Sequence, residues 1–123
     1  MYRLETFLKK YPDAAAVIRG SGNYPKIKGE TMFYETNRGV LIVSHITGLP
    51  QNVDKCKNSI FAFHIHRGEN CTGTAADPFL NVLTHYNSNN CPHPYHAGDM
   101  PPLFGNNGEA FSAFVTTTCL LVM

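Results

Sequence analysis

The chain has 123 residues, of which 43% are hydrophobic, with 10 Lys or Arg against 9 Asp or Glu and a formal net charge of +1. This length and apolar content suffice for one domain with a core but not for two. Because the basic residues form no block, the charge indicates neither a nucleic acid nor an acidic membrane surface as a partner.

The N-terminal region predicts no export or membrane segment. Residues 1–17 include acidic residues and a proline and have no uninterrupted apolar run, so they do not resemble a secretory signal. No stretch approaches the roughly 20 apolar residues that cross a bilayer. The sequence therefore predicts a soluble, cytoplasmic protein.

The predicted elements are a short helix followed by β-strands. Leu4, Phe7 and Leu8 have helical spacing within the first ten residues, ahead of Pro12. Runs of strand length, rich in β-branched and aromatic residues, follow at 14–20, 26–36, 39–49, 59–67 and 108–116. Residues 68–108 have almost no strand pattern, and loops this long in compact domains are usually functional or disordered. These elements predict an all-β fold.

Histidines gather in and before this long loop. Five of the six histidines lie within residues 64–96, and an aspartate follows them: His64, His66, His85, His93, His96 and Asp99. On a strand, side chains at i and i+2 emerge on one face, so His64 and His66 can bind one ion. Imidazole suits zinc and copper, and a carboxylate can complete a tetrahedral zinc site. The sequence therefore predicts a metal site. The alternative is surface histidines whose ring nitrogens bond to water or backbone carbonyls.

The remaining histidine and the cysteines carry weaker signals. His45 has no titratable neighbour in the sequence and is interpreted as a strand histidine, packed or solvated, without chemistry. The four cysteines include no CxxC pair, which argues against a thiolate zinc site. Cys71 and Cys91 bracket the histidine region, so they are candidates for a disulfide that ties the loop, although a reducing compartment argues against one.

Four stretches resemble the copper/zinc superoxide dismutase family over roughly residues 14–116. They are AVIRGSGNYPKIKGETMFYE, ITGLP leading into FAFHIHRGENC, DPFLNVLTHYN, and HPYHAGDMPPLFGNNGEAFSAFVT. The specific feature is the order of a His-x-His, a Cys-bearing loop, a His-Tyr-Asn step and a His-x-Gly-Asp step. The resemblance implies a Greek-key, immunoglobulin-like β-sandwich with a long metal-binding loop. It also implies a single domain over residues 1–123, in which residues 117–123 form a divergent tail.

The same resemblance implies copper and zinc as cofactors and assigns a role to each histidine of the cluster. The copper ligands are His64, His66 and His85, which also carry the catalysis, and the zinc ligands are His85, His93, His96 and Asp99. His85 is then the bridge between the two metals. The implied reaction is the dismutation of superoxide anion to oxygen and hydrogen peroxide. Cys71 resembles the loop cysteine that the family ties to a cysteine near its C-terminus.

The sequence also departs from the family pattern. The family has a fourth copper histidine after the zinc loop and an arginine that attracts superoxide, but no histidine follows His96 and no arginine follows Arg67. With about five of the family's eight strands, the sequence predicts a C-terminally truncated member whose unpaired sheet edges favour a homodimer or aggregation.

Two other functions compete with a dismutase. One is a catalytically impaired module that binds zinc and, weakly, copper. The other, a histidine-zinc hydrolase, ranks last because it needs an open zinc position and a general base, whereas four residues already fill the zinc positions.

Overall fold

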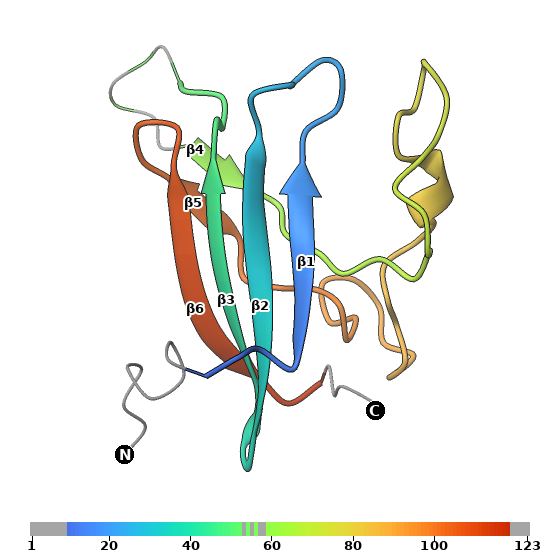
Figure 1. Ribbon diagram of the computed structural model, residues 1–123. Helices are drawn as coiled ribbons and strands as arrows, with labels where there is room; N and C mark the ends of the chain where they lie inside the picture. The colour runs from blue at the N-terminus through green and yellow to red at the C-terminus, as the bar shows by residue number, and fades with distance from the viewer. Residues whose placement is uncertain (1–9, 53, 55, 57–58, 119–123) are drawn as a thin grey trace.

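The fold is described from a computed structural model, which describes residues 10–52, 54, 56 and 59–118. Its main feature is a four-stranded antiparallel sheet in the order β1-β2-β3-β6. The strands are β1 (Ala14–Arg19), β2 (Lys28–Thr36), β3 (Gly39–Thr47) and β6 (Ala110–Thr116). Figure 1 shows β1 at one edge of this sheet and β6 at the other.

A tight turn joins β2 to β3 and sets their register. The Thr36 hydroxyl donates a hydrogen bond to the Gly39 carbonyl at 2.7 Å and accepts one from the Arg38 N–H at 3.1 Å. Gly39 has a φ of +124°, a conformation that favours glycine, and a Cβ there would lie 2.3 Å from the Thr116 carbonyl oxygen. This turn therefore also allows the end of β6 to approach β3.

A second, smaller sheet covers one face of the first. It contains β4 (Ser59–Phe61) and β5 (Leu103–Gly105), which lie behind the large sheet in Figure 1. Buried apolar side chains form two clusters on this side of the large sheet. Ile46, Leu49, Leu103 and Ala110 pack with Phe61 where β4 and β5 lie, and Val40, Ile42 and Met100 pack with Phe63, Ile65 and Tyr86 beside them. β3 is central, and its residues 40–44 are all buried, which explains why the first four of them are a continuous apolar run.

The predicted all-β sandwich is confirmed, with differences in its shorter elements. The strands expected at 14–20, 26–36, 39–49 and 108–116 are present, but β4 ends at Phe61 rather than at residue 67. The region 68–108, where the sequence showed almost no strand pattern, contains two short elements: a single 3-10 turn, η1 (Leu80–Val82), and the strand β5. The helix predicted within residues 1–10 falls almost wholly outside the described residues. Within the described part of the chain, no helix is long and apolar enough to cross a membrane.

Candidate metal centre

Three chain segments meet at the histidine cluster, and backbone hydrogen bonds hold them together. The Ile65 N–H donates to the Gly98 carbonyl at 2.9 Å, and the Tyr86 N–H donates to the Ile65 carbonyl at 2.8 Å. The Gly98 N–H donates to the Tyr86 carbonyl at 2.8 Å, which closes the arrangement. Isolated β-bridges then pair His64 with Asp99 and His66 with His85. The backbone thus places four candidate ligands in two facing pairs.

Gly98 allows these segments to approach one another. A Cβ at this position would lie 2.5 Å from the Ile65 carbonyl oxygen and 3.1 Å from the Tyr86 Cβ. Such distances are too short for any side chain, so only glycine fits between the two segments. The adjacent Ala97 is fully buried, and Met100 packs in the main core with Val40 and Ile42. The cluster is therefore anchored to the sandwich directly beside its ligands.

Asp99 lies at the centre of the cluster, and its side chain is only 6% exposed. Its Oδ1 lies 2.8 Å from His85 Nδ1 and 3.8 Å from His64 Nε2. Its Oδ2 lies 3.2 Å from His93 Nδ1 and 3.1 Å from His96 Nδ1. One carboxylate thus contacts or approaches four imidazoles, which come from all three segments.

The surroundings of Asp99 keep it ionised. Burial acts to raise the pKa of Asp99, but a hydrogen bond from the His96 N–H, at 3.0 Å, and the nearby charge of His96 act to lower it. A hydrogen bond from His85 and the charge of His93 act in the same direction, and the pKa is lowered overall. The carboxylate is therefore available as an anionic ligand at neutral pH.

His64 and His85 lie almost parallel, with ring centroids 3.9 Å apart and an interplanar angle of 21°. Burial lowers the pKa of His64, and the charge of His85 lowers it further. A neutral imidazole is the form that binds a metal. Among the described residues, the group of potential ligands whose donor atoms all lie within 4.8 Å of one another is His64, His85, His93 and Asp99.

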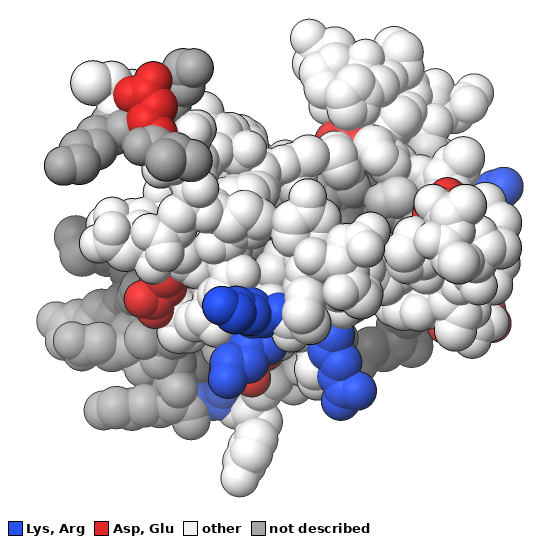
Figure 2. All heavy atoms as spheres, turned by 90° about the horizontal axis from the view of Figure 1, so that it is seen from above, with Lys and Arg blue, Asp and Glu red and all other residues white. Residues whose placement is uncertain are grey.

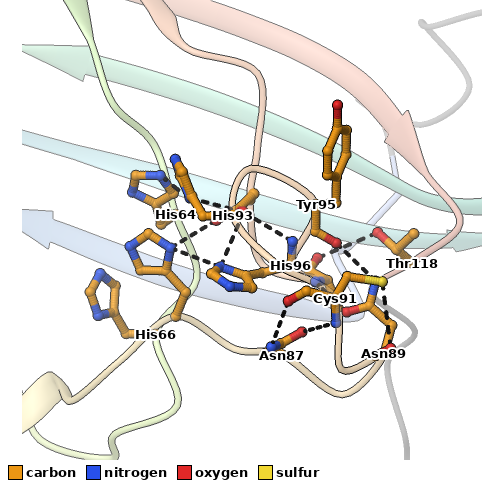
Figure 3. A network of polar contacts seen from close by, with 12 residues as sticks. His64, His66, Asn87, Asn89, Cys91, His93, Tyr95, His96 and Thr118 are labelled. Atoms are coloured by element: carbon orange, nitrogen blue, oxygen red, sulfur yellow. Dashed lines mark hydrogen bonds and ion pairs between the residues drawn. The ribbon is translucent and has the colours of Figure 1, made fainter.

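His96 and His66 lie at different sides of this group. His96 Nδ1 is 3.3 Å from His85 Nδ1, so His96 joins the set around Asp99. The His66 ring centroid is 5.0 Å from that of His85 and 6.3 Å from that of His64. Figure 3 shows His66 at the edge of the cluster. Its Nδ1 lies 2.8 Å from the Leu83 carbonyl oxygen, an acceptor, so Nδ1 carries the proton and Nε2 has the free lone pair.

Two asparagines that the sequence analysis did not single out shape the loop carrying His93 and His96. The Asn87 side chain donates to the Cys91 carbonyl and accepts from the Cys91 N–H, both at 3.0 Å. Asn89 donates to the Tyr95 carbonyl and accepts from the Ala97 N–H, both at 2.9 Å. The only sequence signal for this role is the run of asparagines directly after Tyr86. These side chains act by positioning the ligands.

The cysteines and His45 lie outside the cluster. Cys71 and Cys91 are free thiols, so the disulfide considered between them is not formed in this structure, and Cys119 falls outside the described residues. His45 has no titratable neighbour in sequence, but the pairing of β3 with β6 brings its Nε2 into contact with the Glu109 carboxylate. It also lies beside Phe111, at a ring-centroid distance of 6.3 Å. His45 is thus a surface histidine with an acidic partner.

The donor set fits the two metals expected from the sequence. Three imidazoles and one carboxylate match the ligands and the coordination number of a closed zinc site. The free Nε2 of His66, beside His64 and His85, offers the nitrogen donors that copper prefers. No residue of the cluster supplies a thiolate or requires another kind of ion.

The sequence is similar to that of a known enzyme. Over 105 residues, covering 80% of this chain, the sequence is 31% identical to a Cu-Zn superoxide dismutase of Legionella pneumophila. The chain spans only 58% of the length of that protein. No model of a protein family matches the chain.

Proposed function

We propose that this chain belongs to the copper/zinc superoxide dismutase family and that its histidine cluster is the metal centre of a superoxide dismutase. The observation that carries the proposal is the convergence of four imidazoles on the buried carboxylate of Asp99. The similarity to the Legionella enzyme supports it, because the matched region covers most of the chain. The substrate proposed is superoxide anion.

In this proposal, the zinc ligands are His85, His93, His96 and Asp99, and the copper ligands are His64, His66 and His85. The orientation of His85 supports its role in both sets. Its Nδ1 faces Asp99 at 2.8 Å, so its Nε2 lies on the opposite side of the ring. The contact between His66 Nδ1 and the Leu83 carbonyl likewise directs His66 Nε2 toward an ion.

The reaction converts two superoxide anions and two protons to oxygen and hydrogen peroxide. When bound, copper supplies the one-electron redox chemistry, and zinc is redox-silent. The residues of the chain would move protons and keep the metal ligands in position. His85 can carry a proton at Nε2 in one half of the cycle and release it in the other. His85 Nδ1 and Asp99, which face each other at 2.8 Å, would both hold zinc when it is bound, and that would keep the opposite side of the ring in place.

A second candidate function is metal binding without dismutation. The position of His66 favours it, because the His66 ring centroid is 6.3 Å from that of His64, whereas His96, which like His66 lies outside the group of donor atoms within 4.8 Å of one another, still contacts Asp99 at 3.1 Å. The chain would then hold one zinc ion and bind copper weakly.

One experiment separates the two functions. The chain is loaded with zinc and copper, its metal content is measured, and superoxide consumption is followed. We expect activity that falls by at least about tenfold in His64→Ala, because even the loss of an outer-shell partner of a metal ligand typically costs about 10–100-fold. His45→Ala is the matched control, because His45 lies outside the cluster, and it should keep full activity.

The outcomes differ for the two candidates. Equal background rates in the wild type and in His64→Ala, with zinc still bound, would leave metal binding as the function. Loss of zinc in Asp99→Ala but not in His45→Ala is expected in both cases. A chain that keeps no zinc after dialysis contradicts both.

A further inference from the structure

A pocket lies at the end of the large sheet where β1 and β3 end and β2 and β6 begin. Residues 20–27, 48–52 and 106–109 form the loops around it, at the top of Figure 1, whereas the long loop that carries the metal ligands lies at the right. The volume of this loop pocket is about 480 Å³, within the range of small-molecule sites. None of the proposed metal ligands belongs to its lining.

Backbone contacts fix the shape of the loop pocket. The Leu49 N–H donates to the Gly108 carbonyl at 2.9 Å, which joins the second loop to the third. Gly48 has a φ of +73°, and a Cβ there would lie 1.9 Å from the Lys26 carbonyl oxygen, so only glycine lets the first two loops approach. Asn107 and Gly108 have φ values of +51° and +79°, as in a type I′ hairpin turn. The pocket is therefore preformed, which lowers the entropic cost of binding a ligand.

The polar side chains of the loop pocket are not used inside the fold. They are three amides, a phenol and an ammonium group: Asn23, Gln51, Asn107, Tyr24 and Lys26. Within the described residues, these side chains form no hydrogen bond or ion pair. The amides beside the metal centre, in contrast, bond to the backbone around them. Because an amide both donates and accepts, the loop pocket is suited to a ligand rich in hydroxyl groups.

The charge of the loop pocket is positive. Lys26 is the one charged side chain in its described lining, and Glu109, just beyond the hairpin turn, is already held by His45 Nε2. Arg19 and Lys28 lie directly opposite each other across β1 and β2 at the same end of the sheet. Figure 2, seen from this end, shows Lys and Arg side chains gathered on one side of it. The local field therefore favours a ligand with a negative group.

We propose that the loop pocket binds a sugar unit that carries a carboxylate, as in a uronic acid. The three amides exchange hydrogen bonds with the sugar hydroxyls, and Lys26 pairs with the carboxylate. The ring of Tyr24, a residue that is 54% exposed, offers a flat apolar face to the C–H groups of the sugar. Since the lining has three amides and a single ammonium group, it fits a hydroxyl-rich ligand with one charge better than a polyanion.

The test compares sodium glucuronate with glucose, its neutral counterpart. Each sugar is titrated into the ¹⁵N-labelled full chain, with and without zinc, and N–H signals are followed by NMR. Glucuronate should shift the Leu49 and Gly108 signals with a dissociation constant of roughly 1 mM, as expected for a small ligand in an open pocket. Glucose should bind at least about tenfold more weakly, because it lacks the charge-assisted bond to Lys26. The Tyr86 and Gly98 signals, at the metal centre, should not move.

Matched variants test the individual side chains. Lys26→Met removes the ammonium group but keeps the stem, so it should abolish the preference for glucuronate over glucose, whereas Lys28→Met, outside the lining, should keep it. Gln51→Ala should raise the dissociation constants of both sugars about fivefold, the effect of one neutral hydrogen bond, and Asn52→Ala should not. Circular dichroism checks that each variant folds.

Three results would overturn the proposal. The first is an absence of shifts at Leu49 and Gly108 at glucuronate concentrations well above the expected dissociation constant. The second is equal affinity for the two sugars in the wild type and in Lys26→Met, which would show that no carboxylate is recognised. The third is a glucuronate shift at Tyr86 and Gly98 in place of the loop-pocket signals, which would place the sugar at the metal centre.

Discussion

Two aspartates, Asp13 and Asp99, show how single backbone N–H groups hold a carboxylate in its charged form. The Glu35 N–H donates to Asp13 Oδ2 at 2.7 Å, and this bond is the largest cause of the lowered pKa of Asp13. The His96 N–H does the same for Asp99, where it helps to outweigh the opposing effect of burial. The bond to Asp13 ties the start of β1 to β2, and the bond to Asp99 keeps a proposed metal ligand ionised.

Asp13→Asn tests the first of these bonds. The pKa of Asp13 in the fold lies below its ordinary value of 3.8, so its charge adds stability that is fully present above that value. This stability is lost as the pH falls through the lowered pKa. We expect Asp13→Asn to lower the free energy of unfolding at pH 7 and to make little difference near pH 2, as measured by urea unfolding.

A second variant separates the backbone bond from the ion pair. Lys10 Nζ lies 3.3 Å from Asp13, but its side chain is 52% exposed. Exposed ion pairs contribute little to stability. Lys10→Met should therefore have the smaller effect, and an effect as large as that of Asp13→Asn would contradict this account.

At the scale of the elements, β2 and β3 carry a polar pair inside the core. The Thr31 and Ser44 hydroxyls lie 2.9 Å apart, and the two residues are 2% and 1% exposed. They face each other in the register of the two strands, on the side that carries Phe33 and Ile42. Each hydroxyl is the other's partner, and among the described residues no buried side-chain nitrogen or oxygen lacks one.

The hydroxyl pair predicts a strongly non-additive mutant cycle. Ser44→Ala leaves the Thr31 hydroxyl buried without its partner and should cost about 1–3 kcal/mol of unfolding free energy. Thr31→Val removes that hydroxyl at nearly constant shape, so adding it to Ser44→Ala should recover part of the loss. Denaturant unfolding of both single variants and the double variant gives the coupling energy. Additive costs would show that the two hydroxyls do not depend on each other.

The long strands could be predicted from the sequence, but the positions of the short ones could not. β1, β2, β3 and β6 could be predicted because β-branched and aromatic residues run over their full lengths. β5 was missed because Leu103–Gly105 is a strand only through its pairing with β4 and follows two prolines. The expected strand at 59–67 is split, because residues beyond Phe61 pair as single bridges with the two loop segments.

The same limit applies to the metal centre. Its residue types and their gathering in one region could be predicted from spacing alone. The contact of His66 with the Leu83 carbonyl and the bonds of Asn87 and Asn89 could not, because they depend on how the loop closes. The contact of His45 with Glu109 was likewise hidden, since 64 residues separate the two in the chain.

At the scale of the whole molecule, the proposed metal centre joins parts of the chain that have little core of their own. Its ligands come from three segments between residues 64 and 99, and most residues of the intervening region are exposed. An ion held by all three segments therefore binds the folded chain far better than the unfolded one. Its binding free energy becomes part of the stability of the fold.

Zinc should accordingly raise the midpoint of thermal unfolding. Zinc at 100 times its dissociation constant adds about 2.7 kcal/mol to the unfolding free energy if it binds only the folded chain. We expect this increase in the wild type and in His45→Ala but not in Asp99→Ala, measured by calorimetry with and without a chelator. Hydrogen exchange should show the extra protection at the Ile65, Tyr86 and Gly98 N–H groups, which join the three segments. An equal rise in Asp99→Ala would place the stabilising ion elsewhere.

The pairing of β3 with β6 has a consequence for how the protein is made. β3 ends at Thr47 and its partner begins at Ala110, and every proposed metal ligand lies between them. At roughly 5–20 residues per second, a ribosome takes about 3–12 s to add the intervening residues. During that interval β1, β2 and β3 can already pair, while the apolar edge of β3 has no neighbour. The nascent chain is therefore most prone to misfolding in the interval after β1, β2 and β3 have paired and before β6 has been synthesised.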